Sequence, residues 1–250
     1  MARLVERLFL SARQCIPALA GKETRVNTQA QGEANADKAL ALTLSEQSLV
    51  ELHTDLARNY PEAGSSYWRI RSWGLINWQP IYLALICVYQ LNYVPTSLGR
   101  MKQTRTQDYV AGYELEDDTW QAGNRDQLIY LAGYQLNQIF SPSTEAFMDL
   151  FGGKSVMYQA LLADQFIESL VQATHFSLLS PQQLIDDLPL WAKILNLPLV
   201  SMRGLKYEQD EVRFIRHTCC LHYQREDGDL CIACPRNKSK RRAHVRIKQY

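Results

Sequence analysis

Four of the six cysteines lie in one short segment near the C-terminal end of the sequence. Cys219 and Cys220 are adjacent, ten residues follow, and Cys231 and Cys234 are then separated by two residues. Thiolates are strong ligands for zinc and for iron in clusters. Four cysteines in so short a segment therefore predict a metal or iron–sulfur site.

The spacing indicates which kind of site the thiolates suit. Two cysteines separated by two residues, such as Cys231 and Cys234, can converge on one metal ion or on one iron of a cluster. Adjacent side chains point to opposite faces of an extended strand, so Cys219 and Cys220 need a kinked backbone or an object wider than one ion. The Asp-Gly turn within residues 226–229 predicts a hairpin that brings the two pairs together. The array favours a [2Fe-2S] cluster over a single zinc ion.

Other interpretations of the cysteines remain open. A structural zinc site would use the same four thiolates, and it is the main alternative. A disulfide framework would connect only a short part of a long chain. Cys15 and Cys87 lie instead in apolar, helix-like segments, and we expect them to be buried structural residues.

The complete Cys-Cys-x10-Cys-x2-Cys array, Cys219, Cys220, Cys231 and Cys234, resembles that of the FhuF-like ferric siderophore reductases. The resemblance covers residues 213–236 directly. It implies that the four cysteines hold a [2Fe-2S] cluster. It further implies a cytoplasmic oxidoreductase that reduces Fe(III) in an imported siderophore, of the hydroxamate type, and releases Fe(II) for assimilation. Beyond the cluster ligands, no catalytic or siderophore-binding residue is assigned.

The sequence also limits the partners of the protein. It contains neither a Gly-x-Gly-x-x-Gly fingerprint nor a phosphate loop, so electrons should come from an external donor such as a ferredoxin or a flavoprotein. Residues 235–250 hold seven Lys and Arg and no acid, which leaves an excess of six acidic residues elsewhere. This basic tail is either simply solvated or attracted to an acidic donor or to an anionic membrane surface. Nucleic acid is not expected, because the tail lacks interleaved aromatic residues.

The sequence predicts a soluble, cytoplasmic protein. Charged residues interrupt the apolar positions of residues 1–20, so no signal peptide is expected. The longest strongly apolar run, residues 81–89, is too short for a transmembrane segment, which needs about 20 residues. Apolar residues at helical spacing in residues 1–19 predict an amphipathic helix docked on the body, with peripheral membrane contact as the alternative.

The remaining pattern predicts an α+β fold, with a predominantly helical body, a few short strands and a small C-terminal iron–sulfur hairpin module. Helical spacing recurs in segments 45–58, 128–140, 155–174 and 181–195. Ser180 begins a capping box before the last of these. Looser alternation predicts strands within 98–120 and 199–215. We expect an N-terminal body over 1–198, with a polar linker at 21–38, and a C-terminal module over 199–250 that ends in the basic tail.

Two prolines are expected to mark helix boundaries. Pro80 should open a buried helix that ends near Pro95, and Pro142 should mark a break and a new start. Residues 67–78, just before Pro80, hold three of the five tryptophans together with two arginines. Core packing is the favoured interpretation of these aromatic residues, and a pocket for a flat chelate is the alternative.

Two further functions compete with the reductase. A helical interaction protein with a structural zinc site would be colourless and would carry one zinc ion. An iron–sulfur electron carrier or redox sensor would be coloured and reducible, but it would not turn over ferric chelates. The complete array, with its adjacent cysteine pair, favours the reductase.

Overall fold

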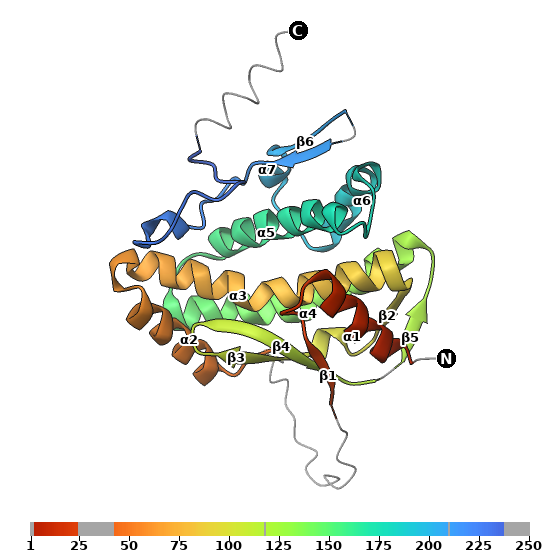
Figure 1. Cartoon of the computed structure of the whole chain (residues 1–250), viewed down its shortest axis with the longest axis horizontal. Helices are drawn as coiled ribbons and strands as arrows, with labels where there is room; N and C mark the ends of the chain where they lie inside the picture. The colour runs from red at the N-terminus through yellow and green to blue at the C-terminus, as the bar shows by residue number, and fades with distance from the viewer. Residues whose placement is uncertain (1–2, 25–42, 118, 210, 238–250) are drawn as a thin grey trace, which may run out of the picture.

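The computed structural model describes residues 3–24, 43–117, 119–209 and 211–237 and confirms an α+β fold with a helical body (Figure 1). The helices are α1 (Leu4–Cys15), α2 (Glu46–Asn59), α3 (Gly64–Ile86), α4 (Arg125–Phe151), α5 (Ser155–His175), α6 (Pro181–Ile194) and α7 (Leu199–Met202). Shorter helical turns cover Pro61–Ala63, Cys87–Leu91, Leu98–Arg100 and His222–Gln224. The strands are β1 (Gly21–Glu23), β2 (Tyr93–Pro95), β3 (Lys102–Thr106), β4 (Tyr109–Leu115), β5 (Trp120–Ala122), β6 (Leu205–Glu208) and β7 (Glu211–Phe214).

The strands form three small sheets. In the largest sheet the order is β1-β4-β3, with β3 and β4 antiparallel and β1 parallel to β4. Strands β2 and β5 form an antiparallel pair, as do β6 and β7. The strands predicted within 98–120 and 199–215 are confirmed. Two details differ: Gly21–Glu23, expected in the polar linker, form β1, and Leu199–Met202, expected to be extended, form α7. Residues 25–38 of the linker lie outside the described residues.

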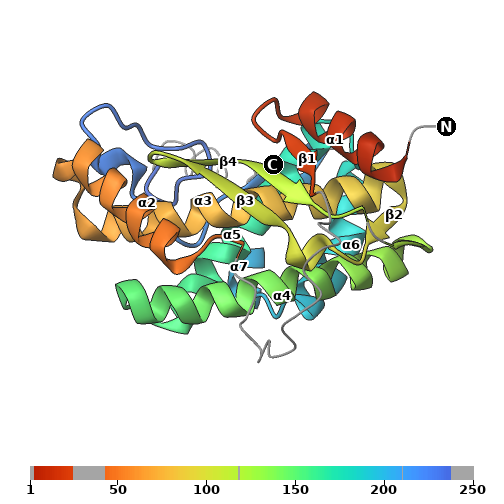
Figure 2. The same ribbon diagram turned by 90° about the horizontal axis from the view of Figure 1, so that it is seen from below.

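Helix α3 runs through the middle of the molecule. Strands β3 and β4 cover one side of it, α4 lies along another, and α5 lies between it and the C-terminal segment (Figures 1 and 2). The ring of Trp73 joins these layers, since its centroid lies 5.2 Å from that of Phe147 in α4 and 5.0 Å from that of Tyr158 in α5. The core thus fixes α3 against α4 and α5. Helix α1 docks on this body through buried residues such as Val5 and Leu8, as predicted.

Pro80 lies inside α3 and does not open a new helix, so the predicted boundary is wrong. A proline has no N–H, and it leaves the carbonyl four residues earlier without its helical partner. Here that carbonyl belongs to Ile76, and the buried Gln103 of β3 donates to it from Nε2 at 2.8 Å. A side chain from another element therefore replaces the missing hydrogen bond.

The break predicted at Pro142 is also wrong, because α4 continues through it to Phe151. Pro142 is buried, and α4 buries Phe140 and Phe147 on either side of it. Packing of both halves of the helix outweighs the local preference of proline. The division of the chain after residue 198 stays a prediction.

Lower pH should destabilise the fold in part through His53. Its ring stacks on Phe151 with centroids 4.6 Å apart, and burial, together with the charge of Arg69, lowers the pKa of His53 below its ordinary value. Because the pKa of His53 is lower in the folded state than in the unfolded state, its neutral form stabilises the fold. This stability is complete above the unfolded-state pKa and is lost as the pH falls through the folded-state pKa. Between about pH 7.5 and about pH 5, wild type should lose more free energy of urea unfolding than His53→Phe. Equal losses in the two proteins would assign the effect to other groups.

Candidate metal centre

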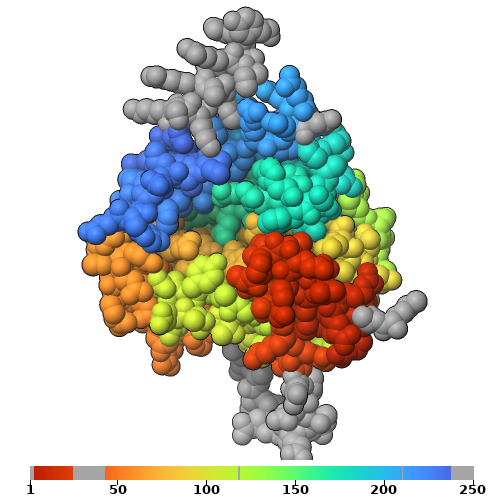
Figure 3. Space-filling model, viewed as in Figure 1, coloured from red at the N-terminus to blue at the C-terminus, as the bar shows by residue number. Residues whose placement is uncertain are grey.

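The cysteine segment lies across α5 and the N-terminal part of α3, where it forms the upper left of the molecule in Figures 1 and 3. The backbone N–H of Arg216 donates to the carbonyl of Ala233 at 2.9 Å and so joins the chain before the first cysteine pair to the loop of the second. The connection between the pairs contains the turn His222–Gln224 and no strand, so the predicted hairpin is a loop. Gly228 is required in this loop, because a Cβ there would collide with the carbonyl of His222.

The loop brings the four cysteine side chains together. The sulfurs of Cys220 and Cys231 lie 3.9 Å apart, and burial, together with the nearby thiols of Cys234 and Cys220, raises the pKa of Cys219. The backbone kink that the adjacent pair requires occurs at Leu221, whose φ of 58° is left-handed. Within the described part of the chain, no three His, Cys, Asp or Glu side chains are arranged around a single metal ion. The thiols of Cys220 and Cys231 are in direct contact, and those of Cys219 and Cys234 lie beside them.

The contact between Cys220 and Cys231 changes the pKa values of both thiols. The hydrogen bond between Cys220 and Cys231 lowers the pKa of the Cys220 thiol to about 5 and raises that of Cys231. Arg216 and His222 also lower the pKa of Cys220. A metal that binds both sulfurs as thiolates would displace the protons that they carry.

Asp164 of α5 holds the chain directly before the first cysteine pair. Its carboxylate is fully buried and accepts hydrogen bonds from the backbone N–H groups of His217, at 3.0 Å, and of Thr218. The hydroxyl of Thr218 donates to the same carboxylate at 2.6 Å. Three charge-assisted hydrogen bonds therefore fix residues 217 and 218 on α5 and position Cys219 and Cys220.

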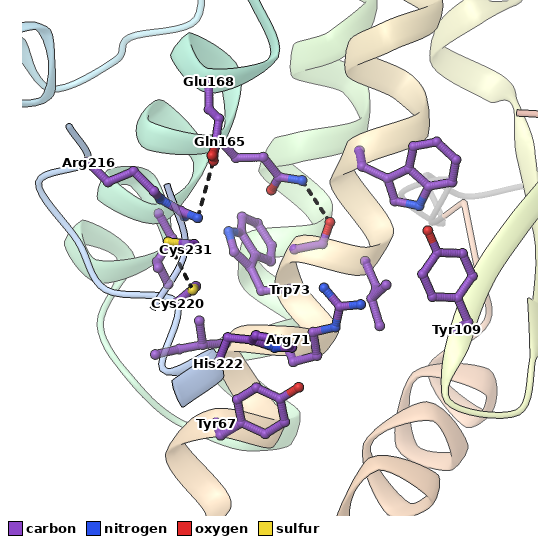
Figure 4. A pocket seen from close by; sticks show the side chains of 15 residues that line it. Tyr67, Arg71, Trp73, Tyr109, Gln165, Glu168, Arg216, Cys220, His222 and Cys231 are labelled. Carbon is purple, nitrogen blue, oxygen red and sulfur yellow. Dashed lines mark hydrogen bonds and ion pairs between the residues drawn. The ribbon is translucent and has the colours of Figure 1, made fainter. Parts of the chain in front are cut away.

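Two buried nitrogen donors beside the cysteines have no hydrogen-bond partner among the residues that the structure describes. These are Nε1 of Trp73 and Nε of Arg216, whose side chain also pairs with Glu168 at 3.4 Å. Both residues lie on the side of a cavity where Cys220 and Cys231 are found (Figure 4). Buried N–H groups normally have acceptors, and the sulfur atoms of a cluster are acceptors. The donors around the cysteines therefore fit an anionic iron–sulfur group.

The cavity has a volume of about 430 Å³ and lies between α3, α5 and the cysteine loop. Helix α3 contributes Tyr67, Arg71, Gly74 and Trp78 to its wall, at the spacing of one helix face. Core packing of the aromatic segment is confirmed for Trp73, which is 1% exposed. Trp73 also lines the cavity, together with the face of α3 formed by Tyr67, Arg71, Gly74 and Trp78.

The remaining cysteines and the basic tail lie apart from this arrangement or beyond the described residues. Cys87 is fully buried and Cys15 is half-buried, and burial raises the pKa of both thiols. The guanidinium of Arg236 lies 4.9 Å from the centroid of the Tyr223 ring. The tail after Asn237 lies outside the described residues, so its partners stay a prediction.

Sequence patterns alone did not single out Asp164, Glu168, Trp73 or Arg216 as part of this site. One signal for Asp164 was present, since it lies four residues after Ala160 in the apolar stripe predicted for this helix. A carboxylate in an apolar stripe is rarely buried without specific partners.

The cysteine segment is similar to a known iron–sulfur domain. Residues 216–236 match the family model described as the FhuF 2Fe-2S C-terminal domain, and this segment contains all four cysteines of the array. No solved structure matches the chain. The matched domain supports a [2Fe-2S] cluster as the cofactor. The resemblance seen in the cysteine array is thus confirmed over residues 216–236, which match the FhuF 2Fe-2S C-terminal domain.

Proposed function

We propose that the protein is a cytoplasmic ferric siderophore reductase that uses one electron to convert Fe(III) in a hydroxamate siderophore to Fe(II). The observation that carries the proposal is a segment that matches the FhuF 2Fe-2S domain and places two of its cysteines, Cys220 and Cys231, at the wall of a cavity. Hydroxamate oxygens hold the hard Fe(III) ion tightly and Fe(II) far less well, so one electron releases the metal. The freed Fe(II) would then enter cellular iron metabolism.

Cys219, Cys220, Cys231 and Cys234 are the proposed ligands of the cluster. Two thiolates on one tetrahedral metal with bonds of about 2.3 Å lie about 3.8 Å apart. The separation of Cys220 and Cys231, 3.9 Å, agrees with this value. We assign these two cysteines to one iron, which leaves Cys219 and Cys234 for the other.

When bound, the cluster supplies a one-electron redox centre. The chain's own residues hold it and favour its reduced state. Asp164 fixes the backbone before the first ligands. The buried N–H groups of Trp73 and Arg216 would donate hydrogen bonds to the sulfur atoms of the cluster. Such donors stabilise the negative charge that the cluster gains when it is reduced. The electron passes from a reduced donor to Fe(III), so the donor is oxidised and the siderophore iron is reduced.

The electron donor is proposed to be a separate protein, such as a ferredoxin or a flavoprotein, because the sequence has no nucleotide-binding motif. Among the described residues, no helix combines the length and the apolar character that crossing a membrane requires. The basic tail suits an acidic donor, with peripheral contact to an anionic membrane as the alternative.

Replacing Trp73 with phenylalanine should lower the midpoint potential of the cluster by about 50 mV, because one donor that favours the reduced state is removed. The potential is measured by anaerobic titration followed by EPR. Trp191→Phe is the matched control. Its indole is equally buried, but it donates to the hydroxyl of Tyr89 at 2.9 Å. Equal shifts in the two variants would show that the indole N–H of Trp73 does not act on the cluster.

The function is tested by mixing dithionite-reduced protein, freed of excess dithionite, with a ferric trihydroxamate in the absence of oxygen. A ferrous chelator should capture about one Fe(II) for each cluster that is reoxidised, since a [2Fe-2S] centre carries one electron. A cluster that stays reduced while the chelate is unchanged would favour an electron carrier or sensor.

A further inference from the structure

The wall of the cavity opposite the cysteine loop is made by one face of α3. Tyr67, Arg71, Gly74 and Trp78 follow one another at intervals of three or four residues and all line the cavity. Its volume, about 430 Å³, falls within the usual range of small-molecule sites. The four core atoms of a [2Fe-2S] cluster would fill only a small part of such a space.

Arg71 is the unusual residue of this wall. It is half-buried, and it makes no hydrogen bond or ion pair with the described residues. The other arginines near the cysteines differ in this respect: Arg216 pairs with Glu168 at 3.4 Å, and Arg225 pairs with Asp227 at 2.6 Å. A half-buried guanidinium without a partner has five free N–H donors, which suit a ligand rich in oxygen acceptors.

Aromatic rings form the wall beyond Arg71. Trp78 of α3 and Tyr109 of β4 lie with ring centroids 6.2 Å apart, and both line the cavity. Figure 4 shows Tyr109 on the opposite side of the cavity from Cys220 and Cys231. Tyr109 is 38% exposed, so this side is open to solvent. Rings of this kind provide flat apolar contact for the carbon skeleton of a ligand.

We propose that this cavity is the binding site of the ferric chelate, and that Arg71 donates hydrogen bonds to the chelate's oxygen atoms. The inference rests on the proposed function, and it places the iron of the substrate in the same cavity as the sulfurs of Cys220 and Cys231. A cluster with four thiolates is negatively charged, and its charge becomes more negative on reduction. The site therefore favours chelates without net negative charge, such as trihydroxamates, over polyanionic ones.

Gly74 provides a means of blocking the cavity without disturbing the core. A Cβ added at Gly74 would meet only Oε1 of Gln165, at 3.9 Å, which is an ordinary contact. Alanine should therefore fit, and it should raise helix stability slightly because glycine is a poor helix former. The longer side chain of leucine would project into the space that we assign to the chelate.

The test measures binding separately from electron transfer. The probe is the gallium(III) complex of a linear trihydroxamate, which resembles the ferric complex but is not reduced, and its binding to the holoprotein is followed by calorimetry. Wild type and Gly74→Ala should bind with dissociation constants within about twofold of each other. Gly74→Leu and Arg71→Gln should each bind at least about tenfold more weakly. Arg203→Gln, an exposed arginine outside the cavity, should match wild type.

Three results would overturn the proposal. Equal binding by Gly74→Leu and Gly74→Ala, with the cluster spectrum and thermal midpoint unchanged, would overturn the assignment of the cavity. Reduction of the ferric complex by wild type without measurable binding of the gallium complex would also overturn it, while leaving the reductase in place. If wild type neither binds the gallium complex nor reduces the ferric one, the site and the proposed function are both rejected. Reoxidation of each variant by ferricyanide confirms that its cluster still transfers electrons.

Discussion

Cys220→Ser is expected to lose the cluster and to reduce ferric chelates at least about 100-fold more slowly than wild type. The sulfur of Cys220 lies 3.9 Å from that of Cys231, the separation expected for two thiolates on one iron. A serine hydroxyl is a harder and far less acidic ligand, so it should not replace the thiolate. Iron analysis and the visible spectrum of anaerobically purified protein measure the loss.

The same variant should keep its helices. The core is formed by residues of α1 to α6 and of the sheets, and it does not depend on the metal. Far-UV circular dichroism should therefore remain close to that of wild type. Cys15→Ser, a half-buried cysteine outside the array, should keep both the iron and the colour. Full iron content in Cys220→Ser, or loss of its helical signal, would contradict the proposed division between fold and cluster.

Asp164→Asn is expected to have the second largest effect. The carboxylate accepts hydrogen bonds from two backbone N–H groups and from the hydroxyl of Thr218. An amide of the same shape accepts at only one of its two ends, so at least one buried donor loses its acceptor. We expect the free energy of unfolding to fall by about 2–4 kcal/mol and the cluster to be lost to an iron chelator about tenfold faster.

Chemical denaturation and the rate of bleaching by an iron chelator measure these two effects. Asp149→Asn is the control, because Asp149 lies exposed on α4 and changes charge by the same amount. Bleaching of Asp164→Asn at the wild-type rate would show that the carboxylate stabilises α5 and the chain beside it without positioning the cluster ligands.

The helices that the sequence predicted correctly depend on local signals. Ser45 accepts a hydrogen bond from the backbone of Ser48, and Ser180 forms a capping box with Gln183, as their positions before apolar stripes indicate. The cysteine site was predictable for a similar reason, since all four cysteines of the array lie within one short segment. In each case the interacting residues are close in sequence.

The boundary at Pro80 was predicted wrongly, and the cavity and Asp164 were not predicted, because the residues involved are distant in sequence. Pro80 is tolerated inside α3 because Gln103, 27 residues from Ile76, donates to the free carbonyl. The cavity needs one face of α3, α5 and the cysteine loop together, and Asp164 meets Thr218 across 54 residues. Hydrophobic periodicity reports which face of a helix is buried, but not which element covers it. These contacts could therefore be identified only from the structure.

Metal analysis of anaerobically purified protein, combined with EPR of the dithionite-reduced sample, distinguishes a redox-active [2Fe-2S] cluster from a zinc site. We expect about two irons and two acid-labile sulfides per chain, no zinc, and an EPR signal of one unpaired electron that disappears when a ferric trihydroxamate is added. A colourless protein with about one zinc ion per chain would contradict this expectation and would leave a structural zinc site in a helical interaction protein.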